Sequence, residues 1–121
     1  MLTTRRADGS PITIPVWFDW DGATLSMFCG AASAKVGRID RDPRITVLVA
    51  NEVDEPENWV VFEGEATVGD GGFEVAEELA GRYWDLTDAS RANTLEEWRS
   101  AASAFARIDL TPTRILGYGG E

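Results

Sequence analysis

Strict alternation of apolar side chains constrains the fold of this 121-residue chain more than any other feature. Every second position from 12 to 20 is apolar: Ile12, Ile14, Val16, Phe18 and Trp20. Successive side chains of a β-strand point to opposite faces, so the pattern predicts a strand whose apolar face lies in the core. Turn-forming pairs flank it, Asp8-Gly9 before and Asp21-Gly22 after. Such pairs are typical of β-hairpins, so the chain is expected to begin as antiparallel hairpins.

Further strands are predicted along the first two thirds of the chain. They cover residues 2–6, 25–29, 44–51 and 59–68, where short apolar runs are bounded by turn residues. A short helix over 33–40 separates the third strand from the fourth, and an acidic loop over 52–58 separates the fourth from the fifth. The side chains expected in the core are those of Leu25, Met27, Cys29, Val60, Phe62, Gly64, Ala66 and Val68.

The last third of the chain changes to helical spacing. Apolar residues at Val75, Leu79, Tyr83 and Leu86 predict one helix. A capping box, Thr94-x-x-Glu97, predicts the start of a second helix with an apolar face of Leu95, Trp98, Ala102 and Phe105. Strand character returns at 108–110 and 115–116, before a Gly-Gly-Glu tail. The pattern predicts one mainly β domain with helices (α+β) over residues 1–121, built as a six-stranded antiparallel barrel.

Composition excludes several classes of function. The chain has no histidine, which rules out Ser-His-Asp and Cys-His catalysis, histidine-bound metals and histidine-ligated haem. Its formal net charge of -10 repels phosphodiester backbones, so no nucleic-acid partner is expected. A single cysteine cannot form an internal disulfide. No apolar run is long enough to span a membrane and no signal peptide is evident, so a cytoplasmic protein is expected.

Four basic residues recur at every third position after the third predicted strand. They are Lys35, Arg38, Arg41 and Arg44, and Lys35 is the only lysine of the chain. A small-residue turn ending at Ser33 precedes them and leads into the predicted helix. Helix N-termini and cationic side chains both attract anions, so strand, turn and helix together predict a phosphate-binding seat. The alternative is a solvated basic face of the helix.

Two large aromatic residues are expected on the outer wall of the sheet. If Val16 and Phe18 face the core, Pro15 and Trp17 face outward, joined by Phe28 from the next strand. An apolar outer surface needs a cover, which could be a flat ring, another subunit or the C-terminal helix that carries Trp98. Proline within a strand indicates an edge or a site of close approach. The three alternatives stay open at this point.

The order of several short motifs resembles the flavin-binding split-barrel family, which includes pyridoxamine 5'-phosphate oxidase and the deazaflavin-dependent reductases of actinobacteria. The motifs are TRRADGSP at 4–11, PVWF at 15–18, SAK at 33–35, RDPR at 41–44 and VFEGEA at 61–66. The resemblance runs from about residue 2 to residue 68. It implies a split β-barrel and a homodimer that holds FMN or the deazaflavin coenzyme F-420 at the subunit interface.

The resemblance also implies roles for individual residues. Ser33, Ala34 and Lys35 resemble the family's Ser-Arg-Lys phosphate motif, with Ala34 in place of the arginine, and Arg38 is expected to compensate. Pro15, Val16, Trp17 and Phe18 resemble the strand beside the ring system, and Phe28 and Cys29 resemble the matching pair on the next strand.

Departures from the family pattern narrow the expected activity. Thr13 stands where the oxidase carries a second phosphate-binding arginine, and the chain lacks the oxidase's C-terminal histidine motif. The deazaflavin-dependent branch is therefore the closer resemblance. The sequence favours a redox enzyme that transfers a hydride between its cofactor and an unidentified small organic molecule. The alternatives are a non-catalytic flavin or deazaflavin carrier, and an interaction module without a ligand.

Overall fold

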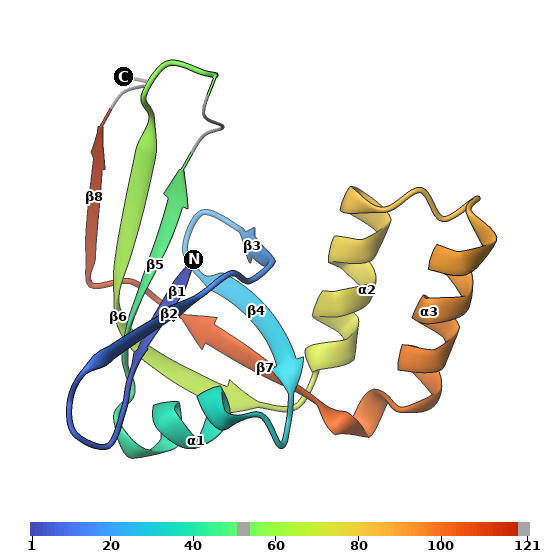
Figure 1. Cartoon of the computed structure of the whole chain (residues 1–121), viewed down its shortest axis with the longest axis horizontal. Helices are drawn as coiled ribbons and strands as arrows, with labels where there is room; N and C mark the ends of the chain where they lie inside the picture. Colours follow the sequence, from blue (N-terminus) through green and yellow to red (C-terminus); the bar gives the residue numbers. More distant parts are fainter. Residues whose placement is uncertain (51–53, 119–121) are drawn as a thin grey trace.

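The computed structural model describes residues 1–50 and 54–118 (Figure 1). Parts of three sequence predictions lie outside these residues: the end of the fourth strand at Asn51, the start of the acidic loop, and the tail over 119–121. The described elements, in chain order, are β1 (Leu2–Arg5), β2 (Pro11–Ile14), β3 (Phe18–Trp20), β4 (Leu25–Gly30), α1 (Ala34–Arg41), β5 (Arg44–Ala50), β6 (Trp59–Gly69), α2 (Gly72–Tyr83), α3 (Ala89–Ser100), the 3-10 turn η1 (Ala102–Ala104), β7 (Phe105–Leu110) and β8 (Arg114–Tyr118).

The strands form one antiparallel sheet in the order β2-β1-β5-β6-β7-β4-β3, and β8 pairs with β6 beside this path. Strand β6 pairs with three other strands, and it can be followed in Figure 1 from the side of β5 and β8 toward β7. Its first part pairs with β5 on one side and β8 on the other, and its last four residues, from Ala66 to Gly69, pair with β7. The predicted α+β class and antiparallel sheet are confirmed, with eight strands in place of six.

Two breaks at prolines contribute to the larger number of strands. The predicted strand over 12–20 is interrupted between Ile14 and Phe18, where Pro15 lacks the N–H that a ladder needs. The alternation was nevertheless read correctly for four of the five residues, because Ile14, Val16, Phe18 and Trp20 pack against the core. Ile12 is half-buried and does not belong to the core cluster. Pro112 separates β7 from β8 in the same way. Strands β2 and β3 are the two ends of the hydrogen-bonded path, and the pairings among described strands do not join them.

The core contains the side chains that the alternation assigned to it. Leu25, Met27 and Cys29 of β4 are buried, as are Phe62 and Ala66 of β6. They pack with further buried side chains from β1, β5, β7 and α1: Leu2, Val47, Ile45, Ala106, Ile108, Leu110 and Ile39. The side chains on the other face of these strands point away from the core, so they are available for contacts with a ligand or a partner.

Helices α2 and α3 form a pair beside β4 and β7 (Figure 1). Helix α2 begins against β7, because a Cβ at Gly72 would collide with the backbone of Ala106. Val75 and Leu79 are buried as predicted, but Tyr83 and Leu86 are exposed because α2 ends at Tyr83. None of the helices in the described part of the chain is long and apolar enough to cross a membrane.

The predicted capping box is wrong. Helix α3 begins six residues earlier, with Asp88 as the N-cap, whose Oδ1 accepts a hydrogen bond of 2.9 Å from the Ser90 N–H. Thr94 lies inside the helix, where its hydroxyl donates to the carbonyl oxygen of Ser90 at 2.9 Å. Phe105, assigned to the same helical face, is the first residue of β7. Leu95 is buried in the helix pair, as expected.

Candidate functional site

The turn between β4 and α1 is held by backbone hydrogen bonds at both of its ends. The Ser33 N–H donates to the Gly30 carbonyl at 2.9 Å, and the Ala31 N–H donates to the Ala104 carbonyl at 2.7 Å. Ser33 is therefore placed as the N-cap of α1, with extended backbone angles. The first N–H groups of a helix have no partner within the helix, so this end of α1 presents free donors. The predicted order of strand, turn and helix is confirmed.

The hydroxyl of Ser33 lacks a hydrogen-bond partner. Its Oγ atom is buried, and no described residue donates to it or accepts from it. The usual N-cap bond from a serine side chain to the helix backbone is also missing. A buried hydroxyl without a partner costs about 1–3 kcal/mol, so native structures rarely leave one unexplained. The hydroxyl and the free helix donors can be satisfied together by the oxygens of one anion.

Lys35 is the second polar group of this turn without a partner. Its side chain is half-buried, and within residues 1–50 and 54–118 its ammonium group forms neither a hydrogen bond nor an ion pair. The first turn of α1 has no acidic residue to neutralise it. A cation near a helix N-terminus is unfavourable, because the helix dipole places partial positive charge there. The position is therefore suited to a ligand that brings negative charge.

The three arginines of the basic series, unlike Lys35, are engaged by the chain itself. Arg38 donates from Nε to the buried Thr4 hydroxyl at 2.8 Å. Arg41 reaches the Arg5 carbonyl at 3.5 Å. Arg44 binds both oxygens of Asp42, at 2.9 and 2.7 Å, and these hydrogen bonds lower the pKa of Asp42 to about 2. Arg38 therefore anchors α1 to β1, and its predicted role in compensating for Ala34 stays a prediction.

The structure brings Trp17 and Phe28 together, at 6.2 Å between ring centroids. Trp98 of α3 lies against Phe28 at 5.9 Å, and Phe105 lies beside both. Trp84 contacts Trp17 at 5.2 Å in an edge-to-face arrangement. Of the three possible covers for this wall, the helix that carries Trp98 is thus present within the chain. Aromatic pairs in these geometries add stability beyond the area that they bury.

The segment between β2 and β3 offers backbone groups rather than side chains. Val16 and Phe18 pack on the core and Cys29 is buried, so these three side chains point away from the outer wall. Pro15, Val16 and Trp17 belong to no strand of the described chain, so their backbone groups take no part in a ladder. Any contact of Val16 or Phe18 with a ligand on the wall would therefore come from the backbone.

The predicted site residues fall into two groups. Ser33, Ala34 and Lys35 share the start of α1, and Trp17 and Phe28 share the wall under α3. Among the residues that the structure describes, no hydrogen bond, ion pair or ring contact joins the two groups. Contact between a single ligand and both groups stays a prediction.

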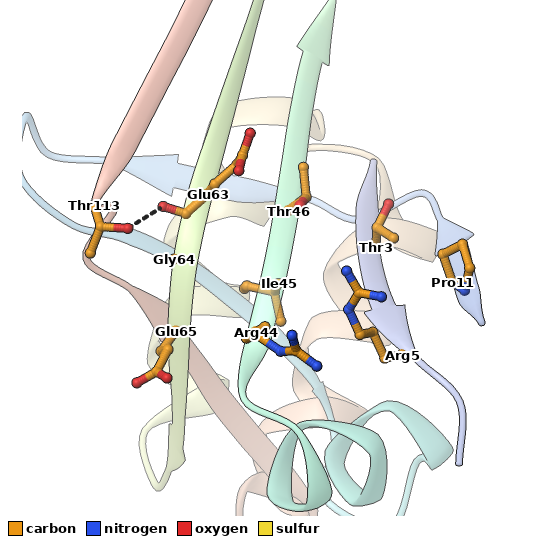
Figure 2. A pocket seen from close by; sticks show the side chains of 10 residues that line it. All are labelled: Thr3, Arg5, Pro11, Arg44, Ile45, Thr46, Glu63, Gly64, Glu65 and Thr113. Atoms are coloured by element: carbon orange, nitrogen blue, oxygen red, sulfur yellow. Dashed lines mark hydrogen bonds between the residues drawn. The ribbon is translucent and has the colours of Figure 1, made fainter. Parts of the chain in front are cut away.

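The sequence reasoning did not find a polar depression on the outer face of β1, β5 and β6 (Figure 2). It has a volume of about 290 Å³ and, apart from Arg44 of the basic series, contains none of the residues expected to bind the cofactor. Its charged side chains are those of Arg5, Arg44, Glu63 and Glu65. The alternation had placed Glu63 and Glu65 outward, and the same reasoning applied to β1 and β5 would have placed the two arginines beside them.

Comparison with solved structures shows where this fold recurs. A conserved hypothetical protein of Mycobacterium tuberculosis aligns with a TM-score of 0.76 at 22% identity, over 97% of this chain and 74% of the other. An F-420 reductase aligns with a TM-score of 0.72 at 22% identity, over 95% and 86%. The haem storage protein HutZ of Vibrio cholerae aligns with a TM-score of 0.68 at 13% identity, over 95% and 82%. At these identities the likeness concerns the fold alone.

Sequence comparison adds a family to this likeness. The family model described as pyridoxamine 5'-phosphate oxidase matches residues 1–116, nearly the whole chain. No curated protein sequence matches this chain.

Proposed function

Because the chain belongs to the pyridoxamine 5'-phosphate oxidase family, we propose that it is a small cytoplasmic oxidoreductase. It works as a homodimer and binds FMN or the deazaflavin coenzyme F-420 at the subunit interface. When bound, the cofactor accepts or donates a hydride in exchange with a small organic substrate. The observation that carries the proposal lies at the start of α1, where neither the buried Ser33 hydroxyl nor the Lys35 ammonium has a partner in the described part of the chain.

The start of α1 fits the phosphate group that both cofactors carry. Ser33 donates its hydroxyl hydrogen to one phosphate oxygen, and the free N–H groups of the first turn donate to others. The Lys35 ammonium supplies the compensating charge. Ala34 contributes only backbone groups to the seat. Arg38 anchors the helix to β1 through its hydrogen bond with Thr4. The Ser33 hydroxyl and the Lys35 ammonium, which lack partners among the described residues, thereby each receive one.

The outer wall is proposed to position the ring system. The backbone of Pro15, Val16 and Trp17 is free of strand ladders and can bond the polar edge of a flat ring, and Phe28 supports it. Val16, Phe18 and Cys29 fill the core beneath and keep the wall rigid. The chain offers no histidine as an acid or base, and solvent can supply the protons that are exchanged with the substrate.

Oxidation of pyridoxamine phosphate is not the favoured reaction. Thr13 stands where the oxidase has an arginine, and its hydroxyl is hydrogen-bonded to that of Thr3 at 2.7 Å. This pair is uncharged and already satisfied, so it adds nothing to phosphate binding. A fold relative described as an F-420 reductase supports the deazaflavin branch.

A carrier that binds the flavin or deazaflavin without turnover is the second candidate. The packing of Trp98 on Phe28 favours it, because this contact already covers part of the wall that a substrate would need to approach. A fold relative described as a haem storage protein is compatible with storage on this fold. Haem itself is a poor fit here, because the sequence lacks the histidine that commonly ligates its iron.

The test is a fluorescence titration of the dimeric protein with FMN and, separately, with F-420, using its five tryptophans as reporters. Lys35→Ala is expected to weaken binding of the correct cofactor at least tenfold, a loss of about 1.5–3 kcal/mol. Arg41→Ala is the matched control, because it removes one positive charge from the same helix at an exposed position. It should change affinity less than about twofold.

Two outcomes decide between the candidates. If neither cofactor binds, or if Lys35→Ala binds as well as the unaltered chain, the phosphate seat is wrong. If the cofactor binds, it is reduced chemically and then mixed with a panel of organic acceptors while its absorbance is followed. Reoxidation that depends on the acceptor supports the enzyme, whereas a cofactor that stays reduced with every acceptor supports the carrier.

A further inference from the structure

Four aromatic side chains form a continuous line between the wall and the surface of the molecule. The ring centroids of Trp98 and Trp84 lie 5.2 Å apart, those of Trp84 and Trp17 5.2 Å, and those of Trp17 and Tyr83 5.5 Å. These are separations of packed aromatic pairs. The line holds three of the chain's five tryptophans and one of its two tyrosines. Indole and phenol are the aromatic groups that lose a single electron most readily, so the line connects the wall to solvent through oxidisable groups.

The two ends of the line lie in different environments. Trp98 and Trp17 both pack on Phe28 of the wall, at 5.9 and 6.2 Å between centroids, and both are half-buried. Tyr83, the last residue of α2, is 55% exposed. An oxidised phenol is stabilised when it loses its proton, and at Tyr83 water can accept that proton directly. An electron vacancy that forms at the wall therefore moves toward Tyr83.

Trp84 is a point of passage in this line and not its end. The guanidinium carbon of Arg91 lies 4.8 Å from the centroid of the Trp84 ring. This cation is attracted to the neutral indole, but it repels the positive charge that the ring gains when it loses an electron. The vacancy is therefore less stable on Trp84 than on Trp17 or Tyr83. Phe28 offers no side branch, because a phenyl ring is much harder to oxidise than an indole.

We propose that Trp98, Trp84, Trp17 and Tyr83 form a one-electron relay that carries oxidising equivalents from the wall to the surface. An organic or oxygen-centred radical at the wall takes one electron and one proton from a tryptophan of the line and becomes a closed-shell molecule. The tryptophan radical then takes an electron from Tyr83, whose phenol proton passes to water while water returns a proton to the indole. A soluble reductant of the ascorbate or thiol class finally gives the Tyr83 radical one electron and one proton, which restores the phenol.

The relay goes beyond the proposed function, and only the origin of the radical at the wall rests on that function. A flavin or deazaflavin that exchanges electrons on the wall is a source of organic radicals there. The transfer from tryptophan to Tyr83, in contrast, needs no cofactor, because each ring of the line belongs to the chain itself. The test is therefore carried out on the cofactor-free chain.

The experiment oxidises tryptophan with azide radicals, a one-electron oxidant selective for indole, generated by pulse radiolysis. It uses a Tyr118→Phe chain, in which Tyr83 is the sole tyrosine, so that any tyrosyl absorption reports on Tyr83. The absorption of the tryptophan radical should decay at the rate at which the tyrosyl absorption rises. This rate should be first-order and independent of protein concentration, because the transfer takes place within one molecule.

Trp17→Phe, added to the same chain, should abolish the concentration-independent rise, because it removes the ring through which Tyr83 contacts the line. Trp20→Phe is the matched control. It also replaces a tryptophan by phenylalanine, but Trp20 packs on Phe62 at the core, 4.9 Å between centroids, outside the line. This variant should keep the rise. Circular dichroism of both variants verifies that they are folded.

Each outcome of the experiment has one meaning. The inference is overturned by an absent tyrosyl rise, by a rate that grows with protein concentration, or by equal effects of Trp17→Phe and Trp20→Phe. Cofactor titration of the same chain separates this result from the proposed function. A chain that shows the relay but binds neither FMN nor F-420 overturns the proposed function alone, whereas a chain that binds a cofactor without the relay overturns the relay alone.

Discussion

The start of α1 and the wall formed by Trp17 and Phe28 were both expected to meet the cofactor, but they differ in how far the chain itself satisfies them. At the start of α1 a buried hydroxyl and an ammonium group have no partner among the described residues. On the wall, Trp98, Trp84 and Phe105 already contact the rings of Trp17 and Phe28, which are half-buried. Unsatisfied polar groups point to a missing ligand, whereas covered apolar groups point to stability.

The largest expected effect tests the wall. Trp98→Ala removes ring contacts with Phe28, Trp84 and Phe105, and should lower the free energy of unfolding by about 3 kcal/mol. Urea unfolding followed by circular dichroism measures it, and Trp98→Phe should cost less than half as much. A loss below about 1 kcal/mol would mean that α3 sits loosely and that the wall is open to a flat ligand.

The next effect concerns Arg38 and tests whether its hydrogen bond to Thr4 anchors α1 to β1. Arg38→Ala leaves the buried Thr4 hydroxyl without its donor, so stability should fall by about 1–2 kcal/mol. In a Thr4→Val background the hydroxyl is gone, and the same substitution should cost much less. Thermal unfolding of the four chains of this double-mutant cycle gives the coupling. Equal costs in both backgrounds would show that the hydrogen bond to Thr4 contributes nothing.

Ser33→Ala should act in opposite directions on stability and binding. The hydroxyl makes no hydrogen bond with the residues that the structure describes, so its removal should raise the free energy of unfolding by up to about 1 kcal/mol, and weaken cofactor binding. Ser90→Ala is the control, because the Ser90 hydroxyl donates to Asp88 at 2.7 Å and its loss should destabilise α3. Destabilisation by Ser33→Ala would contradict the proposal that this hydroxyl has no partner in the folded chain and serves to bind a ligand.

The smallest effect lies at the C-terminal end of α1. Hydrogen bonds from Arg44 hold the pKa of Asp42 at about 2, below its ordinary value of 3.8. A carboxyl with a lowered pKa stabilises the fold above its unfolded pKa, and this contribution is lost as the pH falls toward the folded pKa. Asp42→Asn should therefore cost slightly more at about pH 6 than at about pH 2. The difference is small because the pair is exposed to solvent. A cost independent of pH would contradict it.

Much of the fold follows from local sequence patterns. Alternation placed Leu25, Met27 and Cys29 in the core, because the period of two is a property of the strand itself. The same reasoning could not foresee that Pro15 would break the second strand, since a proline is also tolerated at a strand edge. The capping box failed because Asp88 offered an earlier cap, and two adequate caps cannot be ranked by pattern alone.

In the candidate site, too, the local features were predicted from the sequence, whereas the contacts between residues far apart in the chain were not. The turn before α1 and the position of Lys35 depend on neighbouring residues, and the sequence placed them correctly. The partners of Arg38 and Phe28 lie 34 and 70 positions away, at Thr4 and Trp98. Contacts over such distances depend on how the helices and strands pack, which side-chain periodicity does not contain.

The pairing of β4 with β7 has a consequence for folding during synthesis. Met27 stands opposite Ile108 in this pair, so the two strands meet only after almost the entire chain has been synthesised. Until then β4 has only the three residues of β3 as a strand neighbour, and its apolar face lacks the cover that β7 provides. Closing so long a loop is slow, and exposed strand edges favour aggregation during that interval. Chains that stop before residue 105 should therefore aggregate more readily than the 121-residue chain, which light scattering during refolding would measure.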